Sequence, residues 1–472
     1  MRTVAQSPGI LPAVHTGGEA AAGASFGKHL LLTLFFLTIV LDFRRIEGDE
    51  NPFVVVMGIA NVLLGAWYCV AYGRFTTRLF CWVAPFLLLI GAGTLSGILY
   101  GQETYLVLST AIPMVSFLLA AIAVHAIDGE EEKRIAVGII LATAFMAAAA
   151  KFAFGFYYYE VDFENVRYQI ISGSVPLLFA YGFAGIFSRG QKFALTAIFV
   201  AVLIVVVSVT RTYIIVFGLS ALVCLYSYSK AASRVTGFLV IAIVVAVLGV
   251  ALVELVPGIL GRWNDRITSS EFGVDLSAAY RVAEAEYQLR RLWADGTGLL
   301  LGFGHAAKTG LAGDNVRLIA SELGRHATGY YSFGYGHNVY VGLIYVGGIV
   351  AGVPVMGALF YLLWKGLQRA RQTAATPLDQ FLLIWGVAAF AGYMANGMLA
   401  GTFGNRSISF FCGVSAGLVL LGLEPARHAV REVARRGAEA AGDMRTPKQR
   451  RAALAAGRRS EIQTAAMDSA PG

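Results

Sequence analysis

Two arginines and one histidine of this sequence have side chains that could bind a phosphate group and accept a proton. Arg211 lies at the end of an apolar stretch, Arg281 begins an amphipathic stretch, and His337 comes directly before another apolar stretch. A guanidinium keeps its charge and donates two parallel hydrogen bonds to a phosphate. A neutral imidazole accepts a proton near pH 7. These residues therefore suit a site that stabilises negative charge on a phosphate and accepts a proton.

Each of the three residues also has a purely structural interpretation. Arg211 could be an interfacial arginine whose aliphatic stem lies against apolar surface. Arg281 could form an ion pair with Glu284, three residues later on a helix. His337 could simply begin a helix whose N-cap is Asn338. We favour the chemical role for all three.

The composition places these residues in a membrane protein. Of the 472 residues, 57% are hydrophobic and 14% are charged, and the mean hydropathy is +0.66. Long apolar stretches recur at lengths that cross a bilayer core of roughly 30 Å. The net charge of +8 does not indicate nucleic-acid binding, because the basic residues lie in short loops and a tail without an aromatic and basic patch. The stretch at 30–41 lacks a small-residue cleavage site after it, so we expect the first membrane span there.

The hydropathy pattern predicts an all-α integral membrane protein with about twelve transmembrane helices and one large loop. The helices are expected near residues 29–43, 53–72, 79–99, 105–126, 135–156, 168–187, 193–209, 212–228, 235–256, 338–364, 378–398 and 407–423. The chain then divides into a disordered N-terminus, nine helices, the large loop, three helices and a basic tail, with bounds 1–28, 29–257, 258–336, 337–423 and 424–472. Within the loop, residues 275–293 have the spacing of an amphipathic helix, with one stripe formed by Leu276, Tyr280, Ala283 and Tyr287.

The basic residues of the short loops predict the orientation. One side of the membrane would hold Arg74, Arg78, Lys133, Arg134, Arg189, Lys192, Lys230, Arg234, Lys365, Arg369 and Arg371, and the other only Arg44, Arg45, Arg167, Arg211 and Arg406. Since short cytoplasmic loops are enriched in Lys and Arg, we expect both termini in the cytoplasm and the large loop in the periplasm, with the protein in the inner membrane. The Arg-rich tail is expected to touch anionic lipid headgroups. A loop as long as 258–336 is usually functional.

Four short motifs occur in order between about residues 190 and 365. They are Thr210-Arg211 at a helix end, Tyr280-Arg281 in the loop helix, Gly302-Phe303-Gly304, and His337-Asn338 entering the next helix. Their order and spacing resemble the bacterial O-antigen ligase and O-antigen polymerase family. The sequence departs from the family at Val346, where an acidic residue is common, and at Glu284, close to where a Trp often follows the second Arg.

The resemblance implies a GT-C-like glycosyltransferase that uses no metal and no cofactor. It implies that Arg211 and Arg281 bind the diphosphate of an undecaprenyl-diphosphate-linked glycan, that His337 is the catalytic base, and that Asn338 and Tyr280 support it. The acceptor would be a lipid A–core in a ligase or a second lipid-linked glycan in a polymerase, and this choice stays open. Other polysaccharide-assembly proteins and the bilayer itself are the further implied partners.

Two other functions also fit part of this pattern. A peptidoglycan glycan polymerase of the shape-and-division class also combines many helices with a large outer loop. A twelve-helix transporter or flippase would be expected to show two similar halves. The midpoint loop Ser188–Lys192 is very short, the large loop falls late in the chain, and no repeat between the halves is visible. Transport is therefore the less favoured alternative.

The remaining polar residues are expected to have no catalytic role. His305 and His326 lie in the large loop without a motif around them and are predicted to face solvent. Acidic clusters could in principle hold Mg²⁺ or Mn²⁺, but they are common in short outward loops, so we expect no metal at Glu47, Asp49, Glu50, Glu160, Asp162 and Glu164. The cysteines are predicted to be small core residues rather than disulfide or zinc partners; they are Cys69, Cys81, Cys224 and Cys412.

Overall fold

The computed structural model shows an almost entirely helical protein. It describes residues 17–41, 52–158, 170–188, 191–228, 276–323, 332–372 and 376–424. The long and apolar helices are α1 (Gly17–Val40), α2 (Pro52–Tyr72), α3 (Thr77–Leu99), α4 (Thr104–His125), α5 (Glu130–Tyr158), α7 (Val175–Phe187), α8 (Ala194–Ser208), α9 (Thr212–Ser227), α15 (Val339–Ala370), α16 (Pro377–Leu399) and α17 (Arg406–Leu423). The other elements are α12 (Leu276–Ala294), α13 (Gly296–Leu301), β1 (Lys308–Thr309), α14 (Asn315–Leu323), β2 (Ser332–Phe333) and the 3₁₀ helix η2 (Thr402–Gly404).

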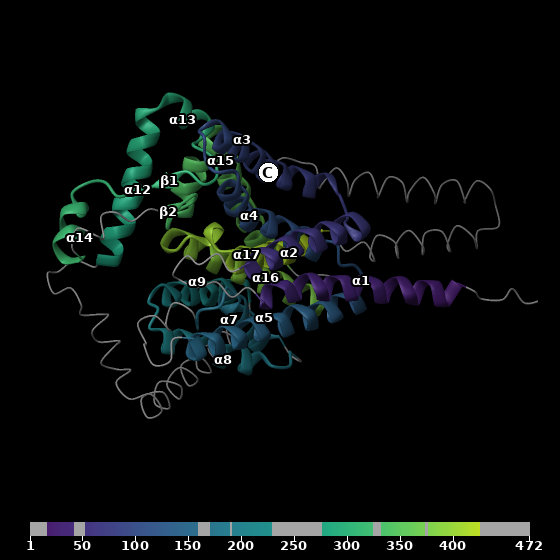
Figure 1. Ribbon diagram of the computed structural model, residues 1–472. Coiled ribbons are helices and arrows are strands. Elements are labelled where there is room, and N and C mark those ends of the chain that lie inside the picture. Colours follow the sequence, from purple (N-terminus) through teal and green to yellow (C-terminus); the bar gives the residue numbers. More distant parts are fainter. Residues whose placement is uncertain are drawn as a thin grey trace, which may run out of the picture.

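The apolar helices run side by side as one bundle, and the elements of the large loop lie together at one end of it (Figure 1). We call this the loop end, defined by α12, α13 and α14, and the opposite one the tail end, where α17 finishes at Leu423. Helix α12 crosses the loop end at a steep angle to the bundle axis (Figure 1). The antiparallel pair of β1 and β2 joins the middle of the loop to the segment that leads into α15.

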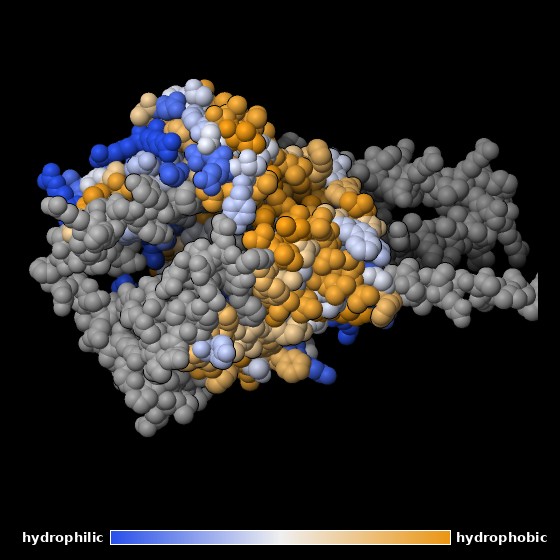
Figure 2. All heavy atoms as spheres, in the orientation of Figure 1, coloured by the Kyte–Doolittle hydropathy of each residue, from blue (hydrophilic) through white to orange (hydrophobic). Residues whose placement is uncertain are grey.

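The surface of the bundle is that of a multi-pass membrane protein. Among the described helices, seven are long and apolar enough to cross a membrane, and four shorter ones are also apolar. Figure 2 shows hydrophobic side chains over the middle of the face of the bundle that it draws, while hydrophilic side chains gather over the loop end. An apolar surface of this kind is what a helical protein exposes to lipid.

Most of the described helices lie within a few residues of where the hydropathy pattern predicts them, but α1, α5 and α7 start five or more residues away and α15 ends later, at Ala370. Helix α1 begins at Gly17, well before residue 29, because the alanines that precede the apolar stretch also favour a helix. Helix α7 begins at Val175, later than expected, because Pro176 in its first turn suits a helix start. The predicted helix at 235–256 and the tail at 425–472 lie outside the described residues. The count of twelve spans therefore stays a prediction.

The interior is formed by α7, α16, α17 and the second half of α4, whose side chains are buried nearly all around. Glycines allow these helices to touch backbone to backbone. A Cβ at Gly413 of α17 would collide with the carbonyl of Phe117 on α4, and one at Gly386 of α16 would come within 2.7 Å of Leu418. Such close approach is how helices pack within a membrane, where the hydrophobic effect gives no preference for helix over lipid contacts.

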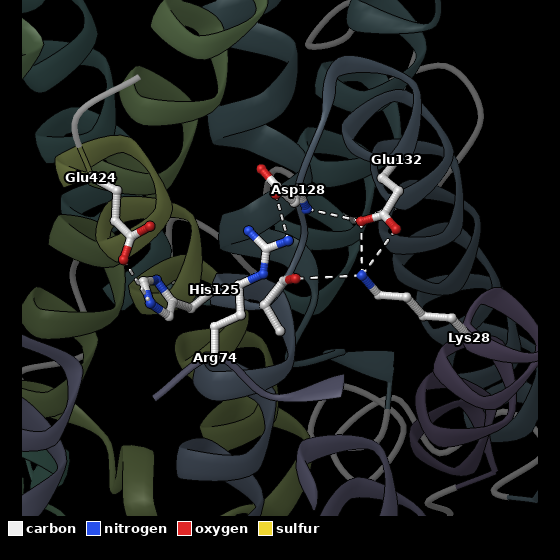
Figure 3. Close-up of polar contacts among 7 residues, drawn as sticks. Lys28, Arg74, His125, Asp128, Glu132 and Glu424 are labelled. Carbon is white, nitrogen blue, oxygen red and sulfur yellow. Dashed lines mark hydrogen bonds and ion pairs between the residues drawn. The ribbon is translucent and has the colours of Figure 1, made fainter. Parts of the chain in front are cut away.

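The tail end is held together by ion pairs between segments that are distant in sequence (Figure 3). The Lys28 ammonium lies 2.8 Å from the Glu132 carboxylate, so α1 is fixed to the start of α5. His125 lies 3.2 Å from Glu424, which joins the ends of α4 and α17. Further pairs connect Arg74 with Asp128 and Lys133 with Asp379. Several basic residues that predict the cytoplasmic side are thus paired with carboxylates.

Candidate active site

A histidine and a glutamate from two different elements form a close pair at the loop end. The Nδ1 atom of His337 lies 2.7 Å from Oε2 of Glu284, and the backbone N–H of His337 donates to the same oxygen at 2.8 Å. Glu284 is only 3% exposed, whereas the His337 side chain is 36% exposed. A carboxylate on Nδ1 favours the tautomer with its proton there, which leaves Nε2 as the acceptor. We call this the Glu284–His337 pair.

The pair exists because α12 turns its polar stripe toward the segment before α15. Tyr280, Glu284 and Gln288 are spaced by four residues and therefore lie on one face of the helix. Gln288 donates to Thr309 of β1 at 3.1 Å, which fixes α12 against the small sheet. Gly336 passes directly over this face with a φ of +63°, and a Cβ there would lie 2.9 Å from the Gln288 amide. The left-handed turn at Gly336 thus delivers His337 to Glu284.

Asn338 is the N-cap of α15. Its side-chain oxygen accepts hydrogen bonds from the backbone N–H groups of Tyr340 and Val341, at 3.1 and 3.2 Å. The structural interpretation is therefore confirmed for Asn338. The cap also directs the positive end of the α15 dipole toward His337, a location that favours bound anions.

The other predicted site residues are distributed over two parts of the loop end. The Tyr280 ring lies 6.0 Å from the His337 ring, edge to face, and Arg281 follows it on α12. Arg211 is the N-cap residue of α9, directly after a turn in which Val209 has a left-handed φ of +51°. Helix α9 packs on α16 and α7, so Arg211 reaches the loop end from another side of the bundle. The observed geometry thus brings Tyr280 and Asn338 to His337, while Arg211 lies at the start of a helix that packs on α16 and α7.

The Gly302-Phe303-Gly304 motif lies between α3 and α15. Phe303 and Gly304 donate backbone hydrogen bonds to the carbonyls of Tyr345 and Val346 at 2.9 and 3.0 Å, and His305 donates to the carbonyl of Gly93 at 2.8 Å. The φ values of Gly302 and Gly304 are +77° and +82°. Side chains would not fit, because the backbones of both neighbouring helices are in direct contact. We call residues 302–305 the inserted segment.

His305 corrects one expectation from the sequence. The sequence predicts a solvent-facing side chain, but His305 is fully buried, with its ring 5.8 Å from that of Tyr335. The reason for the difference is the inserted segment, which carries His305 into the bundle. No sequence signal other than the neighbouring Gly-x-Gly motif indicates this.

Glu284 has a position in the candidate site that the sequence does not predict. The sequence indicates for it only an ion pair with Arg281, or a departure from the Trp that the resemblance leads one to expect. One signal could have revealed it: an acidic residue on the same stripe as Tyr280 and Ala283 must either be buried or break the apolar face. A buried carboxylate needs partners, and His337 is one of them.

The structure bears on some of the possible metal ligands and on all four cysteines. Among the residues that the structure describes, no group of His, Cys, Asp and Glu side chains could hold a metal ion. Both acidic clusters and His326 lie outside this part of the chain. Cys69, Cys224 and Cys412 are buried as predicted, but Cys81 is exposed on α3. Cys81 faces outward because the apolar exterior of a membrane helix also accepts a small apolar residue.

Comparison with known protein families and with characterised proteins found no match for this chain.

The inserted segment yields a test of how the site is positioned. Replacing Gly304 with Ala should prevent the segment from docking, because the new Cβ would meet the backbone of α3 and the left-handed φ of +82° disfavours any side chain. We expect a lower melting temperature in detergent and loss of function. Gly296→Ala is the matched control, since nothing lies within 4 Å of a Cβ there. Equal melting temperatures for the two variants would contradict this packing.

Proposed function

We propose that this protein is a membrane glycosyltransferase. It would transfer a glycan from undecaprenyl diphosphate to an acceptor hydroxyl at the periplasmic face of the inner membrane. The observation that carries the proposal is the Glu284–His337 pair, a buried carboxylate that orients a partly exposed histidine at one end of a membrane bundle. This arrangement is the one expected of a general base that works on a hydroxyl.

The reaction would use the Nε2 atom of His337 as the proton acceptor. As the acceptor hydroxyl loses its proton to Nε2, its oxygen forms a bond with the anomeric carbon of the glycan. The bond from that carbon to the diphosphate oxygen breaks, and the lipid diphosphate leaves with the electron pair. Glu284 would stabilise the imidazolium that forms, as the carboxylate of a catalytic triad does.

The leaving diphosphate needs positive charge held in place. Arg281 lies on α12 three residues from Glu284, and the positive end of the α15 dipole is capped by Asn338 beside His337. Arg211 supplies a further guanidinium at the loop end of the bundle. Either a lipid A–core or a second lipid-linked glycan would suit this arrangement as the acceptor, so ligase and polymerase remain the two forms of the proposal.

The first test replaces the members of the pair in the purified enzyme. His337→Ala should lower glycan transfer by roughly 10²–10⁴-fold, the usual contribution of a general base, while donor binding stays close to normal. Glu284→Gln should lower it by about tenfold or more, because an amide can stabilise the wrong imidazole tautomer.

Glu286→Gln is the matched control for the pair. Glu286 lies on the same helix, but it is more exposed and pairs with Arg290. Its replacement should leave transfer unchanged. Normal turnover by His337→Ala would show that the histidine is not the base.

The second test concerns diphosphate binding by Arg281. Arg281→Lys should weaken donor binding by roughly 10- to 100-fold, since a hydrogen bond to a charged group is worth about 1.5–3 kcal/mol and an ammonium cannot form the planar fork. Arg290→Lys on the same helix is the control, because Arg290 is exposed and a lysine can still pair with Glu286. The measurement is a titration of both variants with the lipid-linked donor. Equal donor affinities for the two variants would show that Arg281 does not bind the diphosphate.

The third test concerns orientation. A single cysteine at Arg317 on α14 should react with a membrane-impermeant thiol reagent in intact spheroplasts, because the proposal places the loop end in the periplasm. A single cysteine at Arg134, exposed at the start of α5, should react only after the membrane is broken. The opposite labelling pattern would place the loop end, and the site with it, in the cytoplasm.

A further inference from the structure

Helix α13 lies below the rim of the bundle rather than above it. The carbonyl of Leu301 accepts from the Ser96 hydroxyl of α3 at 3.4 Å, and the next residues descend until His305 donates to the carbonyl of Gly93. Gly93 precedes the end of α3 at Leu99 by six residues, which is about 9 Å along a helix. The chain therefore enters the depth of the spanning helices at α13 and leaves it again after the inserted segment.

The outward side of this re-entrant stretch is apolar. Trp293 at the end of α12 is 73% exposed, and Leu300 and Leu301 of α13 are 54% and 47% exposed. These side chains continue the exposed face of α3, which carries Leu95 and Leu99. Asp295, between α12 and α13, accepts from the Tyr100 hydroxyl just beyond the end of α3, so the two surfaces are joined at this point. Figure 2 likewise shows hydrophobic side chains in the region where α13 meets α3.

The polar contacts of the same region face inward. The Arg291 guanidinium lies 4.3 Å from the centre of the Phe303 ring and donates to the Tyr345 hydroxyl at 2.7 Å. It also donates to the carbonyl of Lys308 at 3.1 Å. The Arg291 guanidinium is thus turned inward, while a tryptophan and two leucines remain on the outward side. This distribution is the one found where a protein meets the headgroup and acyl regions of a bilayer.

We propose that α13 and Trp293 form a re-entrant membrane segment, with the side chains of Leu300 and Leu301 in the hydrocarbon of the loop-end leaflet and Trp293 at its headgroup level. The occupant of this apolar surface is lipid rather than a partner protein, because the surface is continuous with the lipid-facing side of α3 and lies at the same depth. The bilayer would then anchor the end of α12, the helix that carries Glu284. The inference holds whether or not the protein is a glycosyltransferase.

The test measures how often a nitroxide spin label collides with each of two reagents. Oxygen concentrates in lipid, whereas a nickel chelate stays in water. The full chain, with its four native cysteines replaced by alanine, receives one spin-labelled cysteine at Trp293, Leu300 or Leu301 and is reconstituted in phosphatidylcholine vesicles. Leu95→Cys on α3 is the lipid reference, and Arg317→Cys on α14 is the aqueous reference. We expect oxygen collisions to exceed nickel collisions at 300, 301 and 95, and the reverse at 317. The ratio of oxygen to nickel collisions at position 293 should lie between the ratios at 95 and 317.

Nickel collisions at 300 and 301 that equal those at 317 would overturn the proposal, because the segment would then lie in water. Low collision rates with both reagents would overturn it too, by showing a protein surface over α13. A second measurement uses the protein with its native cysteines in place and records its tryptophan fluorescence. Brominated acyl chains should remove a smaller amount of this fluorescence from the Trp293→Phe variant than from the unaltered protein. Unchanged quenching would contradict the position of Trp293.

Discussion

The break in α15 at Gly348 is the constraint on which the loop end depends. Gly348 has a φ of +62° and a ψ of −168°, so the helical hydrogen bonds across it cannot form. The carbonyls of Tyr345 and Val346 lie just before the break, and they accept instead from Phe303 and Gly304 of the inserted segment. A membrane interior offers no water to satisfy such groups, so the broken helix and the inserted segment each require the other.

The rest of the candidate site follows from that docking. Once residues 302–305 are fixed between α3 and α15, the chain before them must cross the loop end as α12, and the chain after them returns through β1 and β2. Glu284 is thereby buried beside the start of α15. A buried carboxylate is costly unless it is hydrogen-bonded, and here two donors of His337 share one of its oxygens. The same contacts that make the burial tolerable also orient the imidazole.

The two ends of the bundle differ in how they are built. The tail end is closed by ion pairs such as Lys28 with Glu132, which fix short turns between regular helices. The loop end contains a helix broken at Gly348 and a backbone segment inserted between α3 and α15. Irregular backbone at membrane depth is tolerated where other protein groups satisfy it, and it tends to occur at functional sites. This contrast supports locating the chemistry at the loop end.

The sequence by itself determined the membrane class, nearly all the described spanning helices and the cap at Asn338, because hydropathy, helical period and capping are local properties of the chain. It also indicated that α12 is amphipathic and that His337 opens α15. Only the tertiary structure decided that Glu284 faces His337, that His305 is buried and that α13 descends beside α3. Those outcomes depend on contacts between segments about fifty or more residues apart, and on glycines whose space is defined by a neighbouring helix. Local sequence patterns do not specify which other segment a helix will pack against.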